Sequence, residues 1–192
     1  MDVQHLDLKI PLAATEPPDL GALIPVFHRW VREQVFDEQL IDVADYRHVP
    51  AGPGVLVIGH DSNTSLDLAD GRPGLRYVRK TPVSGGPQAA LSDALQSLHA
   101  ARRLLETDAS LSGRFTFDRH ELEIRINDRW LAPNKPESYA ALQPELQRFF
   151  DTLMGTGNAI LQYRPAAREL FCVTVKSRVP SEHAHLPESG PS

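Results

Sequence analysis

The side chains best suited to chemistry gather in one short stretch, GHDSNTSLD, at residues 59–67. His60 and Asp61 follow a short apolar run, and the polar end of a buried strand is a common place for catalytic groups. A histidine can act as a general base when a carboxylate orients its ring. His60 and Asp61 are therefore the candidate catalytic pair. The same polar residues are also typical of a turn that leads into a hairpin.

No recognised catalytic motif supports this pair. The sequence contains no GxSxG, P-loop, GxGxxG or HExxH pattern and no paired-carboxylate motif. Catalysis is therefore the alternative rather than the main interpretation, and we expect no cofactor.

The histidines offer a second kind of chemistry, a metal site. His28, His48 and His60 are the candidate ligands in the first half of the chain, and His183 and His185 form a His-x-His pair near its end. Neither a cysteine pair nor an acidic pair completes a coordination set, so we expect no resident metal.

The composition limits the class of protein. With 192 residues, 41% of them hydrophobic, the chain can bury a core without disulfides. Its single cysteine, Cys172, lies in a predicted strand, where it is expected to be a small core residue rather than a nucleophile. The sequence starts without a signal-peptide pattern, and no segment reaches the roughly 18 apolar residues of a membrane span. These features predict a cytoplasmic protein, and the net charge of −5 argues against nucleic-acid binding.

The periodicity of apolar residues predicts an α+β fold. Helical spacing predicts helices at residues 20–35, 87–105 and 136–154. Alternating or short apolar runs predict strands at residues 3–10, 40–46, 55–60, 65–68, 75–79, 115–117, 122–126, 159–163 and 170–175. Two of the helices contain a proline, Pro25 and Pro144, which either kinks its helix or opens it after a short turn.

The chain contains an internal repeat. Residues 22–31 read ALIPVFHRWV and residues 141–150 read ALQPELQRFF, with Ala, Leu, Pro and Arg at matching positions. LDLKI at residues 6–10 likewise matches LEIRI at residues 122–126. The matches predict two related β-α-β-β units in a pseudo-twofold arrangement. Chance matching of common residues is the alternative.

The repeat sets the expected boundaries. Residues 1–80 hold the first unit and a β-hairpin, residues 81–113 an amphipathic linker helix and a loop, and residues 114–179 the second unit. The polar segment 180–192 has too few apolar residues to pack, so we expect it to be disordered. Residues 1–179 are expected to form one compact domain.

Differences between the two units point to an interaction surface. Val55 matches Phe171 and is expected to face the core, which leaves Leu56 and Ile58 on the opposite face of the strand. The second unit is more polar at the corresponding positions, Cys172 and Thr174. The first unit therefore has an extra apolar face, which the linker helix or a partner protein is expected to cover.

The hairpin offers a second interface, at Leu75 and Tyr77, because a strand at the edge of a sheet can pair with another chain. The main interpretation is a non-catalytic interaction protein or accessory subunit, which forms a homo-oligomer or joins a larger complex. The alternative is a small enzyme or a metal- or ligand-binding protein that uses the first-unit histidines and Asp61.

Overall fold

The computed structural model describes residues 5–14, 19–166 and 169–180, which form an α+β fold. The α-helices are α1 (Leu23–Glu33), α2 (Gly86–Thr107) and α3 (Pro136–Met154). Short 3-10 helices are η1 (Leu20–Ala22), η2 (Ala69–Gly71) and η3 (Ala109–Leu111). The strands are β1 (Leu6–Pro11), β2 (Leu40–Tyr46), β3 (Gly54–Gly59), β4 (Ser62–Asp67), β5 (Gly74–Arg79), β6 (Glu121–Ile126), β7 (Ala159–Tyr163) and β8 (Phe171–Ser177).

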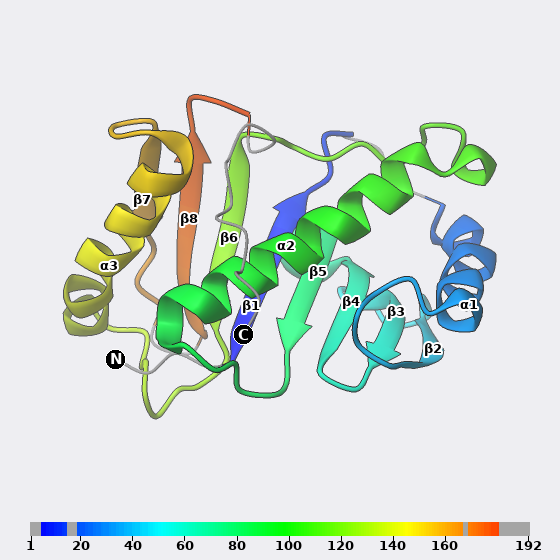
Figure 1. Cartoon of the computed structure of the whole chain (residues 1–192), viewed down its shortest axis with the longest axis horizontal. Coiled ribbons are helices and arrows are strands. Elements are labelled where there is room, and N and C mark those ends of the chain that lie inside the picture. Colours follow the sequence, from blue (N-terminus) through cyan, green and yellow to red (C-terminus); the bar gives the residue numbers. More distant parts are fainter. Residues whose placement is uncertain (1–4, 15–18, 167–168, 181–192) are drawn as a thin grey trace.

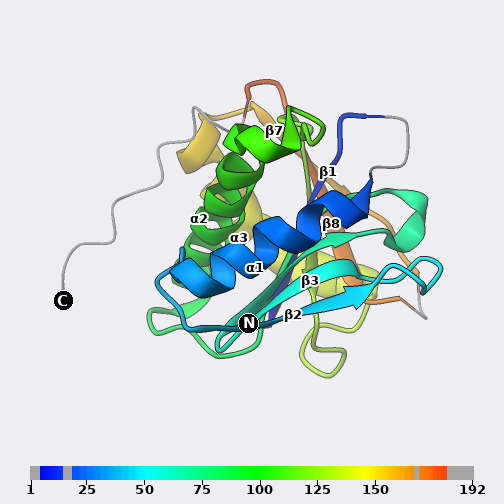
Figure 2. The same cartoon turned by 90° about the vertical axis from the view of Figure 1, so that its right-hand side faces the viewer.

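All of these strands pair in one eight-stranded antiparallel sheet with the order β2-β3-β4-β5-β1-β6-β8-β7. The three α-helices lie on the same face of the sheet (Figures 1 and 2), and we call the other face the helix-free face. α1 packs on β2 and β3, α2 on β5 and β1, and α3 on β7. None of the described helices is both long enough and apolar enough to cross a membrane.

The core lies between the helices and the sheet, because alternate residues of each strand point toward the helices. One row crosses the sheet in register and contains Val57, Thr64, Tyr77, Leu8, Ile124 and Val173. α2 buries Leu91, Leu95 and Leu98 against this side of the sheet, which is the apolar stripe that its sequence predicts. The predicted linker helix is thus part of the core.

Two segments differ from their predicted structures. Residues 115–117 form no strand, although Phe115 and Phe117 are buried, because only Phe117 bridges to Leu12 beyond the end of β1. The strand predicted at residues 65–68 is shifted toward the N-terminus and begins three residues earlier, as β4 (Ser62–Asp67). β4 lies between β3 and β5, so ladder hydrogen bonds hold a sequence with few apolar residues in extended form.

The two helix prolines lie in different environments. Pro25 is in the first turn of α1, directly after η1, so it opens the main helix after a short turn. Pro144 is inside α3, where it has no N–H to donate to the carbonyl of Ala140. Pro144 therefore does not open its helix, in contrast to Pro25.

The two halves of the chain meet at the centre of the sheet, where β1 pairs with β6. Each half runs strand, helix, strand, strand along the chain, as β1-α1-β2-β3 and as β6-α3-β7-β8. In both halves the strand that follows the helix lies at an edge of the sheet. The two halves differ because β4 and β5 separate β3 from β1, whereas β8 pairs directly with β6.

Candidate functional site

The structure does not bring the candidate histidines together. His28 is exposed on α1, His48 lies in the turn before β3 and His60 in the turn after it, so His48 and His60 flank opposite ends of one strand. Within the described residues, no group of three His, Cys, Asp or Glu side chains could hold a metal ion. His183 and His185 lie outside the described residues.

His60 and Asp61 have different surroundings. His60 is exposed, and its backbone N–H donates to the carbonyl of Gln39. The carboxylate of Asp61 accepts a hydrogen bond from the Thr81 hydroxyl at 2.8 Å. Asp61 therefore links the β3–β4 turn to the segment that follows β5.

Asp61 also lines a groove of about 560 Å³ between the α1–β2 connection and α2. Glu38 in this groove accepts hydrogen bonds from the N–H groups of Asp61 and Ser62, at 2.7 and 2.9 Å. Asp93 pairs with Arg79 at 2.8 Å, and burial raises the pKa of the Asp93 carboxyl despite this guanidinium. The acids of the groove thus hold the β3–β4 turn and the start of α2 in place.

A groove of about 900 Å³ lies between α2 and α3. Gln88, Ser92 and Gln96 line it from α2, and Arg148 and Thr152 from α3. This wide groove mixes neutral, basic and acidic side chains, so its chemistry favours no particular class of ligand.

The predicted hairpin interface does not exist. Leu75 and Tyr77 are both buried on the helix side of the sheet. Their strand, β5, pairs with β4 on one side and with β1 on the other, so it has no free edge. The sequence could not reveal this, because β1 comes from the distant N-terminal end of the chain.

Leu56 and Ile58 alternate with the buried Val55 and Val57, so they lie on the helix-free face, where each is half-buried. On the same face, Leu56 pairs with Ala44 of β2. Ile58 pairs with Asn63 of β4, which in turn pairs with Val78 of β5. α2 packs on β5 and β1 from the other side, so the linker helix does not cover these residues. The predicted covering of this face by the linker helix is therefore wrong.

We name this group the β3 patch. Its members are the apolar residues of the helix-free face at the β2–β5 end of the sheet: Ala44, Tyr46, Leu56, Ile58 and Val78. Tyr46, with 41% of its surface exposed, stacks on His48 with ring centroids 6.4 Å apart.

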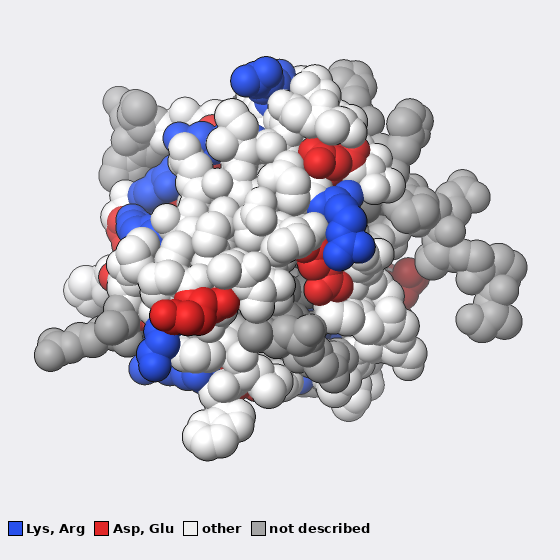
Figure 3. Space-filling model, turned by 90° about the vertical axis from the view of Figure 1, so that its left-hand side faces the viewer, with Lys and Arg blue, Asp and Glu red and all other residues white. Residues whose placement is uncertain are grey.

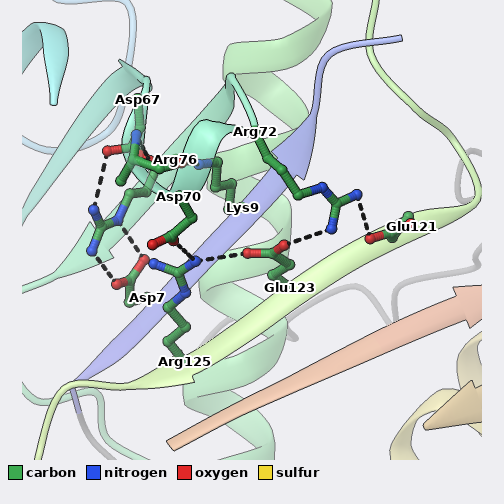
Figure 4. Close-up of polar contacts among 10 residues, drawn as sticks. Asp7, Lys9, Asp67, Asp70, Arg72, Arg76, Glu121, Glu123 and Arg125 are labelled. Carbon is green, nitrogen blue, oxygen red and sulfur yellow. Dashed lines mark hydrogen bonds and ion pairs between the residues drawn. The ribbon is translucent and has the colours of Figure 1, made fainter. Parts of the chain in front are cut away.

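The centre of the helix-free face carries a charged network that sequence reasoning missed (Figure 4). The ammonium group of Lys9 donates to Asp67 at 2.6 Å and to the Ala69 carbonyl at 3.2 Å. Arg76 donates to both carboxylate oxygens of Asp7 and to Asp67 at 3.2 Å. Lys9 and Asp67 side chains are each only 1% exposed.

The network continues across β6. Arg125 donates to Glu123 at 2.9 Å and to Asp70 of η2, and Arg72 donates to Glu123 at 3.0 Å. Burial by itself lowers the pKa of the Arg125 guanidinium, but hydrogen bonds and nearby carboxylates raise that pKa above its usual value. Opposite charges thus pair across four neighbouring strands and the η2 turn. This pairing favours one register of the strands rather than the binding of an ion.

Cys172 lies on the same face and is 8% exposed. Burial raises the pKa of its thiol, although Arg125 nearby acts in the opposite direction. A thiol that is both buried and harder to ionise is a poor nucleophile.

We expect Cys172 to react slowly with Ellman's reagent in the folded protein at pH 8. The rate should be at least about tenfold lower than in urea-unfolded protein, because both access and thiolate formation are restricted. Absorbance at the thionitrobenzoate band measures both rates. Equal rates in the two conditions would contradict the burial of this thiol.

Among the described residues, Trp130 is the most exposed large apolar side chain, with 93% of its surface accessible. It lies in the turn between β6 and α3, where the Asp128 carboxylate accepts hydrogen bonds from the N–H groups of Trp130 and Leu131. One exposed aromatic residue does not define a site. The other tryptophan, Trp30, is buried, so we expect its fluorescence to change strongly on unfolding. The fluorescence of the exposed Trp130 should change little.

The chain matches no model of a known protein family, and a search of curated proteins also finds no match.

Proposed function

We propose that this protein is a non-catalytic interaction module that binds another protein through the β3 patch. Burial is the observation that carries the proposal. Leu56 and Ile58 remain half-buried on a face that no α-helix covers, whereas the charged side chains of Lys9 and Asp67 on the same face are almost fully buried. Apolar side chains grouped on an uncovered sheet face are typical of a protein-binding surface.

The charges around the β3 patch favour a basic partner over a second copy. Asp42 pairs with Ile58 in the β2–β3 ladder and is exposed, and its carboxylate accepts a local hydrogen bond from the Val43 N–H at 2.7 Å. A second copy would present the same acid on a chain of net charge −5. A partner with Lys or Arg beside apolar side chains would complement it. The single buried cysteine fits the proposed cytoplasmic setting.

Ile58→Asp should abolish partner binding without unfolding the protein. A carboxylate in the centre of an apolar interface loses solvation without gaining a partner, which costs at least about 2 kcal/mol, or more than tenfold in affinity. The partner would be identified by crosslinking in the host. Its binding to the wild type and to variants would then be measured with both proteins purified, by calorimetry.

Two control variants make the result specific. His60→Ala should leave affinity unchanged, because the proposal requires nothing of its imidazole. Ile160→Asp places the same charge on the other edge of the sheet and should also bind normally. A partner that binds Ile58→Asp as tightly as the wild type would refute the proposed surface, and a loss of activity or bound metal in His60→Ala would favour the enzyme or metal alternative.

We also propose that the two halves arose by duplication of one β-α-β-β unit. The matching sequence segments support this, as do the shared order of elements and the similar place of the last two strands in each half. The β4–β5 hairpin is then an insertion. Its side chains on the helix-free face, Asp67 and Arg76, pair with charged residues of β1.

A further inference from the structure

The sheet ends in two edge strands, β2 and β7. An edge strand exposes unpaired N–H and C=O groups that can pair with another chain, and proteins usually block such edges. The two edges of this sheet differ in how they are blocked.

Side chains block the β2 edge. Gln34, at the end of α1, donates to the Leu40 carbonyl and accepts from the Leu40 N–H, both at 2.9 Å. A register shift follows between Leu40 and Asp42, and the Asp42 carboxylate accepts from the Val43 N–H. A bulge, aspartates and capped backbone groups are the usual means of preventing strand pairing.

The β7 edge has neither a bulge nor an aspartate, although Gln147 caps one of its carbonyls. Its sequence, AILQY, contains no charge, and it pairs with β8 residue for residue. The Arg178 N–H donates to the Asn158 carbonyl, so the alternation of an antiparallel ladder directs the backbone groups of Leu161 and Tyr163 away from β8. Ala159 also points outward, and its carbonyl accepts a bond of 3.3 Å from Gln147 of α3.

The surface around this edge is also suited to contact. Ile160 is 44% exposed on the helix-free face of β7. Figure 3 views the molecule from the α3 and β7 side and shows a central area without charged side chains, bordered by charged groups. An uncharged centre with a charged rim is the usual composition of a protein interface.

We propose that β7 pairs antiparallel with β7 of a second copy, about a twofold axis at Leu161, so that the two sheets become continuous. Leu161 then lies opposite itself, and Ala159 lies opposite Tyr163 of the second copy, a small residue against a large one. Ile160 lies opposite Gln162. The pairing forms about six backbone hydrogen bonds, two of them in competition with Gln147.

The choice of a second copy follows from this self-complementarity, because a twofold interface uses the same residues on both sides. β2 is less suited to pairing with itself in this way, since the register shift between Leu40 and Asp42 and the bonds of Gln34 to Leu40 interrupt its free edge. A strand of five residues is too small for the roughly 800 Å² that each partner buries in a stable interface. α3, which packs on β7, supplies a second layer of contact across the axis.

The test is the mass of the purified full chain in solution, by light scattering and sedimentation velocity. The wild type should be a dimer at about 50 µM. Ile160→Lys should be monomeric, with a dissociation constant at least about tenfold higher, because two lysines would lie diagonally across the axis. The exposure of Ile160 makes it a mild substitution for the fold, and circular dichroism checks this.

Ile41→Lys is the matched control, since Ile41 is the exposed isoleucine of β2, 54% accessible. It should remain dimeric. Leu161→Pro is a second variant, which removes an outward N–H without removing a bond to β8. In the wild type, hydrogen exchange at Leu161 and Tyr163 should slow as concentration rises through the dissociation constant.

A monomeric wild type would overturn the proposal, as would a dimer that Ile41→Lys dissociates or that Ile160→Lys leaves intact. The dimer uses a different surface from the β3 patch, so Ile58→Asp should remain dimeric. Loss of partner binding with the dimer intact, or the reverse, therefore tests the two proposals separately.

Discussion

Asp67→Ala is expected to lower the free energy of unfolding by about 3–5 kcal/mol, because it leaves the Lys9 ammonium buried without its carboxylate. Lys9 and Asp67 are each 1% exposed and lie 2.6 Å apart, so water cannot replace the lost partner without a local rearrangement. Arg76 loses its weaker bond to Asp67 but keeps Asp7. Since domains of this size are stable by about 5–15 kcal/mol, the variant should approach the limit of folding. Urea unfolding followed by Trp30 fluorescence measures the change.

Two comparisons separate the charge effect from general disruption. Lys9→Met combined with Asp67→Leu should be within about 1 kcal/mol of the wild type or more stable, because the double substitution removes the pair rather than half of it. Arg32→Ala breaks the exposed pair with Glu33 and should change stability by no more than about 0.5 kcal/mol. If the double variant were as unstable as Asp67→Ala, the loss would come from packing and not from an unpaired charge.

Gly54→Ala is expected to destabilise the protein by at least about 3 kcal/mol, through backbone strain and a direct clash. Gly54 has a φ of +65°, and a Cβ atom there would lie 2.1 Å from the carbonyl oxygen of Leu66. β3 and β4 are paired strands, so this carbonyl cannot move without breaking the ladder. Thermal and urea unfolding of the purified variant measure the loss.

Gly71→Ala is a matched control, because Gly71 has the same φ of +65° but no atom within 4 Å of the added Cβ. It should cost about 1–2 kcal/mol, the usual penalty for an alanine in the left-handed region. The difference between the two variants isolates the contact with the Leu66 carbonyl. Equal losses would show that this contact contributes nothing.

The local pattern of apolar residues was sufficient to predict most of the helices and strands. The stripe of leucines in α2 and the apolar alternation of β6 predict a helix and a strand, because a side chain's direction depends only on the local backbone. The same reasoning correctly separated Leu56 and Ile58 from Val55 and Val57 on the two faces of β3. The start of β4, at residues 62–64, was harder to predict, since this strand is held by its neighbours β3 and β5 rather than indicated by apolar periodicity.

The sequence by itself determined the α+β class, the positions of the helices and the face of β3 on which Leu56 and Ile58 lie. Only the tertiary structure decided that β1 inserts between β5 and β6, which buries Leu75 and Tyr77 and pairs Lys9 with Asp67. It also separated the histidines and left β7 as an unblocked edge. The physical reason is that strand neighbours are chosen by long-range packing and charge pairing, whereas periodicity reports only local direction.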